Sequence, residues 1–195
     1  MILYHMSQSL QLGDSLSLDH EQTSLLCQPF VQALEKGEDF FYGMILNGKY
    51  LYAVLGKSGL WEWANYAKWA TEGAFEHVRL REYPYCISRL KCSFFYDNLQ
   101  DCKMLFAYDW GTSSPEEQAR VHLFEFETDD SDLQRFDMRI FDEAYEAMSD
   151  RQDVAAVLDC AKRYFAGKQT QKPIWEILSA KPLIAVKDVT GELHC

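Results

Sequence analysis

The chain has 195 residues, 48% hydrophobic and 14% aromatic, which is enough to bury one sizeable core. Thirty acidic against nineteen basic residues give a net charge of −11, and this argues against a nucleic-acid partner because phosphate backbones repel such a surface. No run approaches the roughly 18–20 apolar residues of a membrane span, and the start lacks the regions of a signal peptide. We therefore expect one cytoplasmic domain over residues 1–195 with no membrane partner, while delivery to another cell stays open.

The cysteines and histidines show no spacing typical of a metal site or a disulfide framework. The six cysteines lie far apart without a C-x-x-C pair, and the five histidines form no H-x-x-x-H pattern. We expect reduced thiols, mostly small core residues, and no metal. The cysteines are Cys27, Cys86, Cys92, Cys102, Cys160 and Cys195.

The first third of the chain mixes strand and helix signals. Residues 2–6 (ILYHM) predict a short strand, and residues 10–18 predict a turn through Gly13 followed by alternation. Asp19 or Thr23 is a suitable N-cap for a helix that ends near Gly37. The segment 41–56 is ambiguous, because Asn47-Gly48 between apolar runs indicates a hairpin whereas KYLYAVL also fits a helix.

The middle of the chain begins with a helical pattern over residues 60–82. Its alanines recur three or four residues apart and its aromatics cover most of the surface, which is typical of a buried core helix, and Pro84 ends it. Residues 91–96 (KCSFFY) read as a strand, after which Asp97 is expected to cap a helix, NLQDCKMLFAY. Ser114-Pro115 followed by two glutamates is a helix-start signature.

The last third adds further strands and helices. Residues 121–128 (VHLFEFET) predict a strand, and helical patterns cover residues 143–148 and 154–165, the second stopped by Gly167. A polar loop over residues 167–173 leads into two extended segments, IWEIL and PLIAVKDV. Strands and helices are mixed without a βαβ rhythm, so the fold class expected is α+β.

The usual nucleotide loops and the G-x-S-x-G elbow are absent. What remains is a set of polar residues in or beside apolar strands: His5, Ser88, Arg89 and Glu176. Each of them alone is more often structural than functional. Glu176 raises the sharpest question, because a buried ionised carboxylate without a partner costs several kcal/mol or shifts its pKa. Since its own strand face carries two apolar residues, we expect it to point inward.

Three blocks of the sequence resemble a known superfamily. YHMSQSLQLGDSL resembles the start of ADP-ribosyltransferase-like domains. AFEHVRLREYPYCISRLKCSFFYDNLQDC is similar to a block of a bacterial family of unknown function often grouped with that superfamily, in which an F-E-x-x-R helix leads to a proline, a Ser-Arg pair and an aromatic strand. YFAGKQTQKPIWEILSAKPLIAV resembles that family's closing block, Y-x-x-G followed by W-E-x-L. The blocks occur in the expected order and span most of the chain.

The resemblance implies a split, twisted mixed β-core with helices around a cleft that holds NAD as substrate. It implies that His5 contacts a ribose, that the Met6 backbone holds the nicotinamide amide, and that Ser88 with Arg89 lies beside them. It also implies that Glu176 binds the ribose hydroxyl and steadies the transition state.

The ring that packs on nicotinamide is open among Tyr83, Tyr85 and Tyr96, of which Tyr96 is included in the expected site. Arginine-directed relatives carry an acidic residue where this chain has Ile174, which speaks against arginine modification.

The chemistry of the residues agrees with this resemblance. Cleaving the nicotinamide–ribose bond builds positive charge on the sugar, which a fixed carboxylate in a water-poor setting stabilises, and Arg89 can pair bidentately with the diphosphate. We expect an NAD-dependent ADP-ribosyltransferase-like enzyme or an NAD glycohydrolase. The acceptor is not named by the sequence, a protein being one candidate. A non-catalytic nucleotide- or protein-binding module of the same fold, or an interaction protein with an acidic face, remains an alternative.

This hypothesis makes a geometric prediction. His5 and Glu176 should lie on neighbouring central strands and open into one pocket, and Ser88 and Arg89 should converge on the same cleft.

Overall fold

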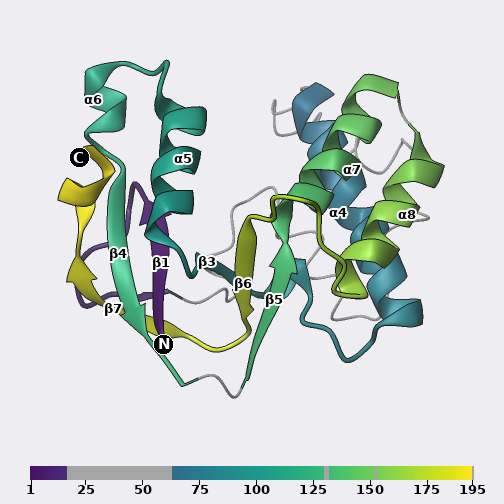
Figure 1. Cartoon of the computed structure of the whole chain (residues 1–195), viewed down its shortest axis with the longest axis horizontal. Helices are drawn as coiled ribbons and strands as arrows, with labels where there is room; N and C mark the ends of the chain where they lie inside the picture. The colour runs from purple at the N-terminus through teal and green to yellow at the C-terminus, as the bar shows by residue number, and fades with distance from the viewer. Residues whose placement is uncertain (17–62, 130–131, 152, 195) are drawn as a thin grey trace, which may run out of the picture. The chain divides into compact units, whose positions relative to one another are not determined.

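The computed structural model describes residues 1–16, 63–129, 132–151 and 153–194 (Figure 1). The expected helix that begins at Asp19 or Thr23, and the ambiguous segment 41–56, lie outside the described residues. The chain divides into two compact units. The sheet unit holds residues 1–18, 92–135 and 174–195, and the helical unit holds residues 19–91 and 136–173. The chain is an α+β protein, and the single domain expected over residues 1–195 stays a prediction.

The sheet has seven strands in the order β2-β7-β4-β1-β3-β6-β5. Each strand pairing with a defined register is antiparallel, so the mixed core that we expected is not seen in these pairings. The strands are β1 Ile2–Ser7, β2 Ser15–Leu16, β3 Ser93–Tyr96, β4 His122–Glu127, β5 Leu133–Asp137, β6 Trp175–Ser179 and β7 Leu183–Asp188. Most of these strands follow the expected segments, but β5 was missed.

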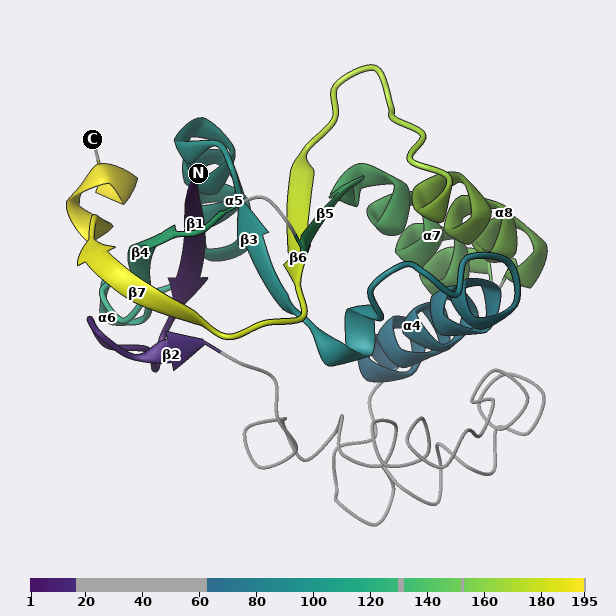
Figure 2. The same ribbon diagram turned by 90° about the horizontal axis from the view of Figure 1, so that it is seen from below.

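The junction between β1 and β3 is the narrowest point of the sheet. Along β1, all residues from Ile2 to Ser7 have register partners on β4, whereas on the β3 side only Tyr4 has one, Tyr96. Figure 2 shows β1 and β3 diverging away from this contact. The sheet is therefore split here, with β2-β7-β4-β1 on one side and β3-β6-β5 on the other.

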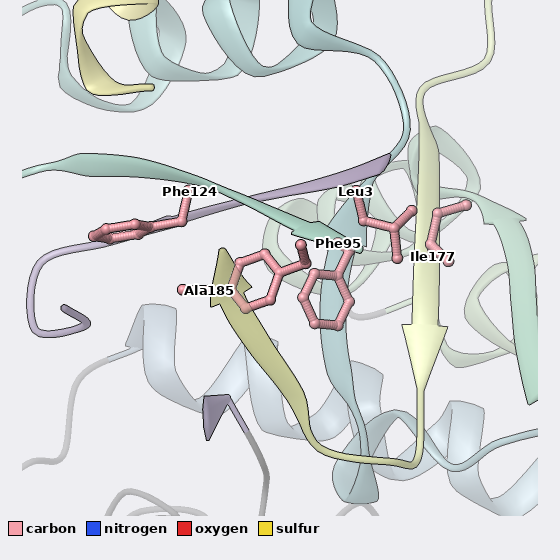
Figure 3. Close-up of a cluster of buried hydrophobic side chains, with 6 residues drawn as sticks. Leu3, Phe95, Phe124, Ile177 and Ala185 are labelled. Atoms are coloured by element: carbon pink, nitrogen blue, oxygen red, sulfur yellow. The ribbon is translucent and has the colours of Figure 1, made fainter. Parts of the chain in front are cut away.

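Both faces of the sheet carry apolar clusters because successive side chains on a strand point to opposite faces. On one face, side chains from β1, β3 and β6 converge, as Figure 3 shows for Leu3, Phe95 and Ile177. Phe124, Phe126 and Ala185 complete that cluster. The other face packs against helix α5, Leu99–Trp110, through Cys102, Phe106, Val121, Leu123 and Leu193.

The helix starts of the sheet unit test two sequence predictions. Asn98, not Asp97, is the N-cap of α5, because its Oδ1 accepts a 2.9 Å hydrogen bond from the backbone N–H of Gln100. The prediction of Asp97 was therefore one residue early. The short helix α6, Pro115–Gln118, has the full capping box that Ser114 and Glu117 indicate, which confirms the start signature. A 3-10 helix, η3 Thr190–His194, closes the described chain.

The helical unit is built from α4 Trp63–Glu82, α7 Met138–Arg151 and α8 Val154–Phe165, with the 3-10 turn η1 Arg89–Lys91 (Figure 2). Ala67, Ala70, Ala74 and Phe75 of α4 are buried, which confirms the core helix. Helix α8 matches its prediction, and Gly167 follows it with a φ of 69° that favours glycine. Helix α7 begins earlier than predicted. None of the described helices has the length and apolar character to cross a membrane.

Candidate functional site

Glu176 lies on β6, between β3 and the edge strand β5, and is almost fully buried. Its residue is 3% exposed, so the prediction that it points inward is confirmed. On β3 its register partner is Tyr96, whose partner on β1 is Tyr4. Residues directly opposite one another share a sheet face, so the carboxylate and the two phenol rings stand in one row at the β1–β3 junction.

The row continues on the other side of β1. Tyr4 is opposite Glu125 on β4, and Glu125 is opposite Lys187 on β7. The Nζ atom of Lys187 lies 3.3 Å from both carboxylate oxygens of Glu125. Burial, and then the negative charge of Glu125, raise the pKa of Tyr4. Tyr4 was missed at the sequence level, since only the strand order reveals that it lies beside Tyr96.

His5 lies against the split between β1 and β3. Its Nδ1 atom is 2.8 Å from the carbonyl oxygen of Phe94. Because a carbonyl oxygen only accepts, Nδ1 carries the proton in this bond, and Nε2 of the neutral ring is an acceptor. Burial lowers the pKa of His5, opposed by the bond to Phe94, which raises it. The ring is thus held as a neutral imidazole of fixed tautomer.

The predicted pocket shared by His5 and Glu176 is corrected by the strand order. Strand β3 lies between β1 and β6, so the two residues are not on neighbouring strands. The alternation of side chains places His5 on the face of Phe95, whose ring centroid is 5.9 Å from the His5 ring, and Glu176 on the face of Tyr96. Two strand spacings separate them by about 10 Å. The sequence indicates strands but not the order in which they pair.

Met6 is paired with Leu123 of β4, and its side chain packs on the cluster beneath α5. Among the described residues, β3 has no register partner for Met6, because the β1–β3 pairing stops at Tyr4. The backbone role expected for Met6 stays a prediction.

Arg89 has a different environment from the one expected. It is 7% exposed, and its Nε atom donates a 3.0 Å hydrogen bond to Glu72 while Nη1 donates a 2.8 Å bond to Tyr164. Its guanidinium carbon lies 3.9 Å from the ring centroid of Phe141. Such a buried, hydrogen-bonded ion pair is costly to break. We therefore replace the expected diphosphate contact of Arg89 with a structural role.

Ser88 belongs to the same buried network. Its Oγ donates a 2.9 Å hydrogen bond to Glu76, which also accepts bonds of 2.9 and 2.7 Å from Nε and Nη2 of Arg79. Glu72, Glu76 and Arg79 all lie on α4, so the F-E-x-x-R helix holds the Ser-Arg pair. Tyr164, from the Y-x-x-G block, completes the network on α8.

The expected site is thereby divided between the two units. Ser88 and Arg89 belong to the helical unit, whereas His5, Met6, Tyr96 and Glu176 belong to the sheet unit. Of the other two candidate rings, Tyr83 stacks on Phe165 within the helical unit. Tyr96 is the candidate that is aligned with Glu176.

The described cysteines lie in the interior of the protein. Cys86, Cys92, Cys102 and Cys160 are buried cysteines, and burial raises the pKa of Cys102 to about 12. Within the part of the chain that the structure describes, no three or more His, Cys, Asp or Glu side chains are arranged to hold a metal ion.

Fold and site together define an α+β protein with a split antiparallel sheet that carries a buried carboxylate one strand away from the split. Residues 3–190 match the model of a family described as "Protein of unknown function (DUF2441)". Because this match covers nearly the whole chain, the protein belongs to that family, whose description names no activity. A comparison with curated proteins gave no match.

Proposed function

We propose that this protein cleaves the nicotinamide–ribose bond of NAD, as an ADP-ribosyltransferase-like enzyme or an NAD glycohydrolase, and that Glu176 is its catalytic carboxylate. In this step the bond between ribose C1′ and the nicotinamide nitrogen breaks, and the electron pair leaves with nicotinamide. An acceptor nucleophile or water then forms the new bond to C1′ and gives up its proton.

The observation that supports the proposal is the burial of Glu176, at 3% exposure, in one row with Tyr96 beside the split of the sheet. Positive charge develops on the ribose as its bond to nicotinamide breaks. A carboxylate that is already fixed in a water-poor setting stabilises this charge far more than a solvated one does. A strand glutamate with a purely solvent-facing role would not be buried.

The neighbouring groups supply complementary roles in the proposal. The ring of Tyr96, on the same sheet face as Glu176, packs on nicotinamide. His5 lies on the opposite face, beside the split, so the ribose hydroxyl from which its Nε2 accepts a hydrogen bond belongs to the part of NAD beyond the split. The neutral tautomer that the Phe94 carbonyl imposes on His5 suits this acceptor role. All of these groups belong to the sheet unit.

The negative charge of the sheet unit limits which acceptor can approach it. The sheet unit contains fourteen acidic and five basic residues, so it carries nine of the eleven net negative charges of the chain. This favours a neutral or cationic acceptor, such as a protein side chain, or water, over a nucleic acid.

The test is the release of nicotinamide from NAD by the wild type and by Glu176→Gln, with melting curves for both. We expect the mutation to lower turnover by about two to three orders of magnitude, the scale of losing one preorganised electrostatic group. The fold and most of the NAD affinity should be retained. Glu127→Gln is the matched control, because Glu127 is an exposed glutamate on β4 and should leave turnover unchanged.

Two outcomes decide against catalysis by Glu176. Equal rates for the wild type and Glu176→Gln remove this carboxylate from the mechanism. No release from the wild type, combined with a rise in melting temperature on adding NAD, assigns the protein as a binding module without turnover.

A further inference from the structure

A second group of side chains stands directly beside the Tyr96–Glu176 pair. Strand β3 ends at Tyr96 and strand β6 begins at Trp175, so Asp97 and Trp175 occupy the next position along these two strands. Arg135, on β5, reaches both of them. Its Nη2 atom lies 2.9 Å from Oδ2 of Asp97, and its guanidinium carbon lies 4.2 Å from the centroid of the Trp175 ring.

This arginine differs from Arg89 in its exposure. The side chain of Arg135 is 50% exposed and that of Asp97 is 20% exposed. A guanidinium has five N–H donors in a planar fork that matches phosphate oxygens. The guanidinium lies over the Trp175 ring and binds Asp97 through Nη2, while half of the side chain faces solvent. Arg135 is thus oriented and accessible at the same time.

The other basic residues of the sheet unit are placed elsewhere. Lys103, Lys181 and Lys187 pair with Glu192, Asp132 and Glu125, respectively. Arg120 lies in the exposed turn after α6. Arg135 is therefore the basic residue on the strand beside β6, in contact with the residue that precedes Glu176.

We propose that Arg135 binds the diphosphate of the nucleotide substrate, with Trp175 and Asp97 as positioning residues. This inference rests on the proposed function. It assigns to Arg135 the diphosphate binding that was expected of Arg89, whose guanidinium is instead bound to Glu72. Because side chains alternate along a strand, Trp175 and Glu176 point to opposite faces of the sheet. The β1–β3 and β3–β6 pairings, however, both end at Tyr96, the partner of Glu176. A dinucleotide can pass round the strand ends, so that its ribose meets Glu176 and its diphosphate meets Arg135.

The test is titration calorimetry in the Glu176→Gln background, where NAD is not consumed. The ligands are NAD, ADP-ribose and nicotinamide riboside, the last of which lacks phosphate. We expect Arg135→Ala to weaken NAD and ADP-ribose about tenfold or more, as for a lost hydrogen bond to a charged group. Nicotinamide riboside should change less than twofold. Arg135→Lys should recover part of the loss, since the charge stays but the planar fork does not.

Arg120→Ala serves as the control for losing one positive charge from the same unit, and it should bind all three ligands like the parent. The inference is overturned if Arg135→Ala binds NAD like the parent, or if nicotinamide riboside weakens as much as NAD. Neither result contradicts the proposed function if Glu176→Gln has slowed nicotinamide release. Absence of NAD binding by the wild type overturns both.

Discussion

The two units of this protein differ in their balance of charge and in where the polar residues of the expected site lie. In the helical unit, acids and bases are buried as partners: Glu72 binds Arg89, and Glu76 binds Arg79 and Ser88. In the sheet unit, acids outnumber bases fourteen to five, and the buried carboxylate of Glu176 is aligned with the Tyr96 ring. The first arrangement matches a structural network. The second provides negative charge where the proposed reaction requires it.

The comparison shows why a motif is not by itself a site. Ser88 and Arg89 were predicted from the sequence to line an NAD site, yet their donors are directed at the glutamates of α4. Neighbouring polar residues such as these can bind a ligand, but they can equally hold one helix against another. Only the partners of each donor separate the two roles.

The largest effect should come from breaking the pair in the helical unit. Arg89→Met should lower the free energy of unfolding by about 3–5 kcal/mol, because Glu72 is left as a buried charge without its guanidinium. The measurement is urea unfolding. The double variant Arg89→Met/Glu72→Leu should recover most of this loss.

A matched control for that pair lies on the surface of the same unit. Lys162 and Glu82 form an ion pair with side chains 50% and 43% exposed. Lys162→Ala should change stability far less than Arg89→Met does, because exposed ion pairs contribute little. If Arg89→Met costs no more than this control, Arg89 is not a structural residue, and its role in binding diphosphate is open again.

A smaller loss is expected from Ser88→Ala. The mutation removes one donor from Glu76, which is 3% exposed and keeps its two bonds to Arg79. A buried acceptor that loses one partner costs about 1–3 kcal/mol. Urea unfolding measures this loss, and NAD affinity should not change. A Ser88→Ala protein of normal stability that binds NAD poorly would reverse the assignment of this residue.

Helix capping in the sheet unit gives a loss of about 1 kcal/mol. Asn98→Ala removes the side-chain acceptor for the Gln100 N–H at the start of α5 and should lower stability by about that amount. Asp97→Ala should not reproduce a cap loss, because the cap is Asn98. Thermal melts of the two variants, compared side by side, distinguish the observed cap from the one that the sequence predicted. An Asn98→Ala protein as stable as the wild type would contradict this assignment.

The smallest effect concerns pH. Because burial lowers the folded-state pKa of His5 below its ordinary value of 6.5, the unfolded chain takes up a proton before the folded chain does. Stability should therefore fall as pH drops below about 6.5 and should not change through this group above it. His5→Gln should flatten this part of the stability curve. An unchanged slope in His5→Gln would contradict the lowered pKa of this partly buried ring.

Much of the fold was predictable because local patterns determine it. The alanine spacing of α4, the capping box at Ser114 and the extent of α8 were all recognised from neighbouring residues. Strand β5 was missed because its sequence, LQRFD, alternates too weakly and leads directly into α7. The inward orientation of Glu176 was predictable from the apolar residues on its own face.

The parts that failed depend on contacts between distant residues. The order β1-β3-β6 separates His5 from Glu176, and no local pattern fixes strand order. The partners of Arg89 come from residues 17 and 75 positions away in the chain. Arg135 was overlooked for the same reason, since its contacts to Asp97 and Trp175 appear only when three strands lie side by side.

The measurement that tests the central claim most directly is amide hydrogen exchange on Glu176→Gln, with and without saturating NAD. If the nucleotide binds at the junction of the split sheet, exchange should slow in peptides that cover His5 to Ser7, β3 and the start of β6. The peptide that covers Ser88 and Arg89 should exchange as it does without NAD. Protection confined to that peptide, or no protection anywhere at saturating NAD, would contradict a nucleotide site in the sheet unit.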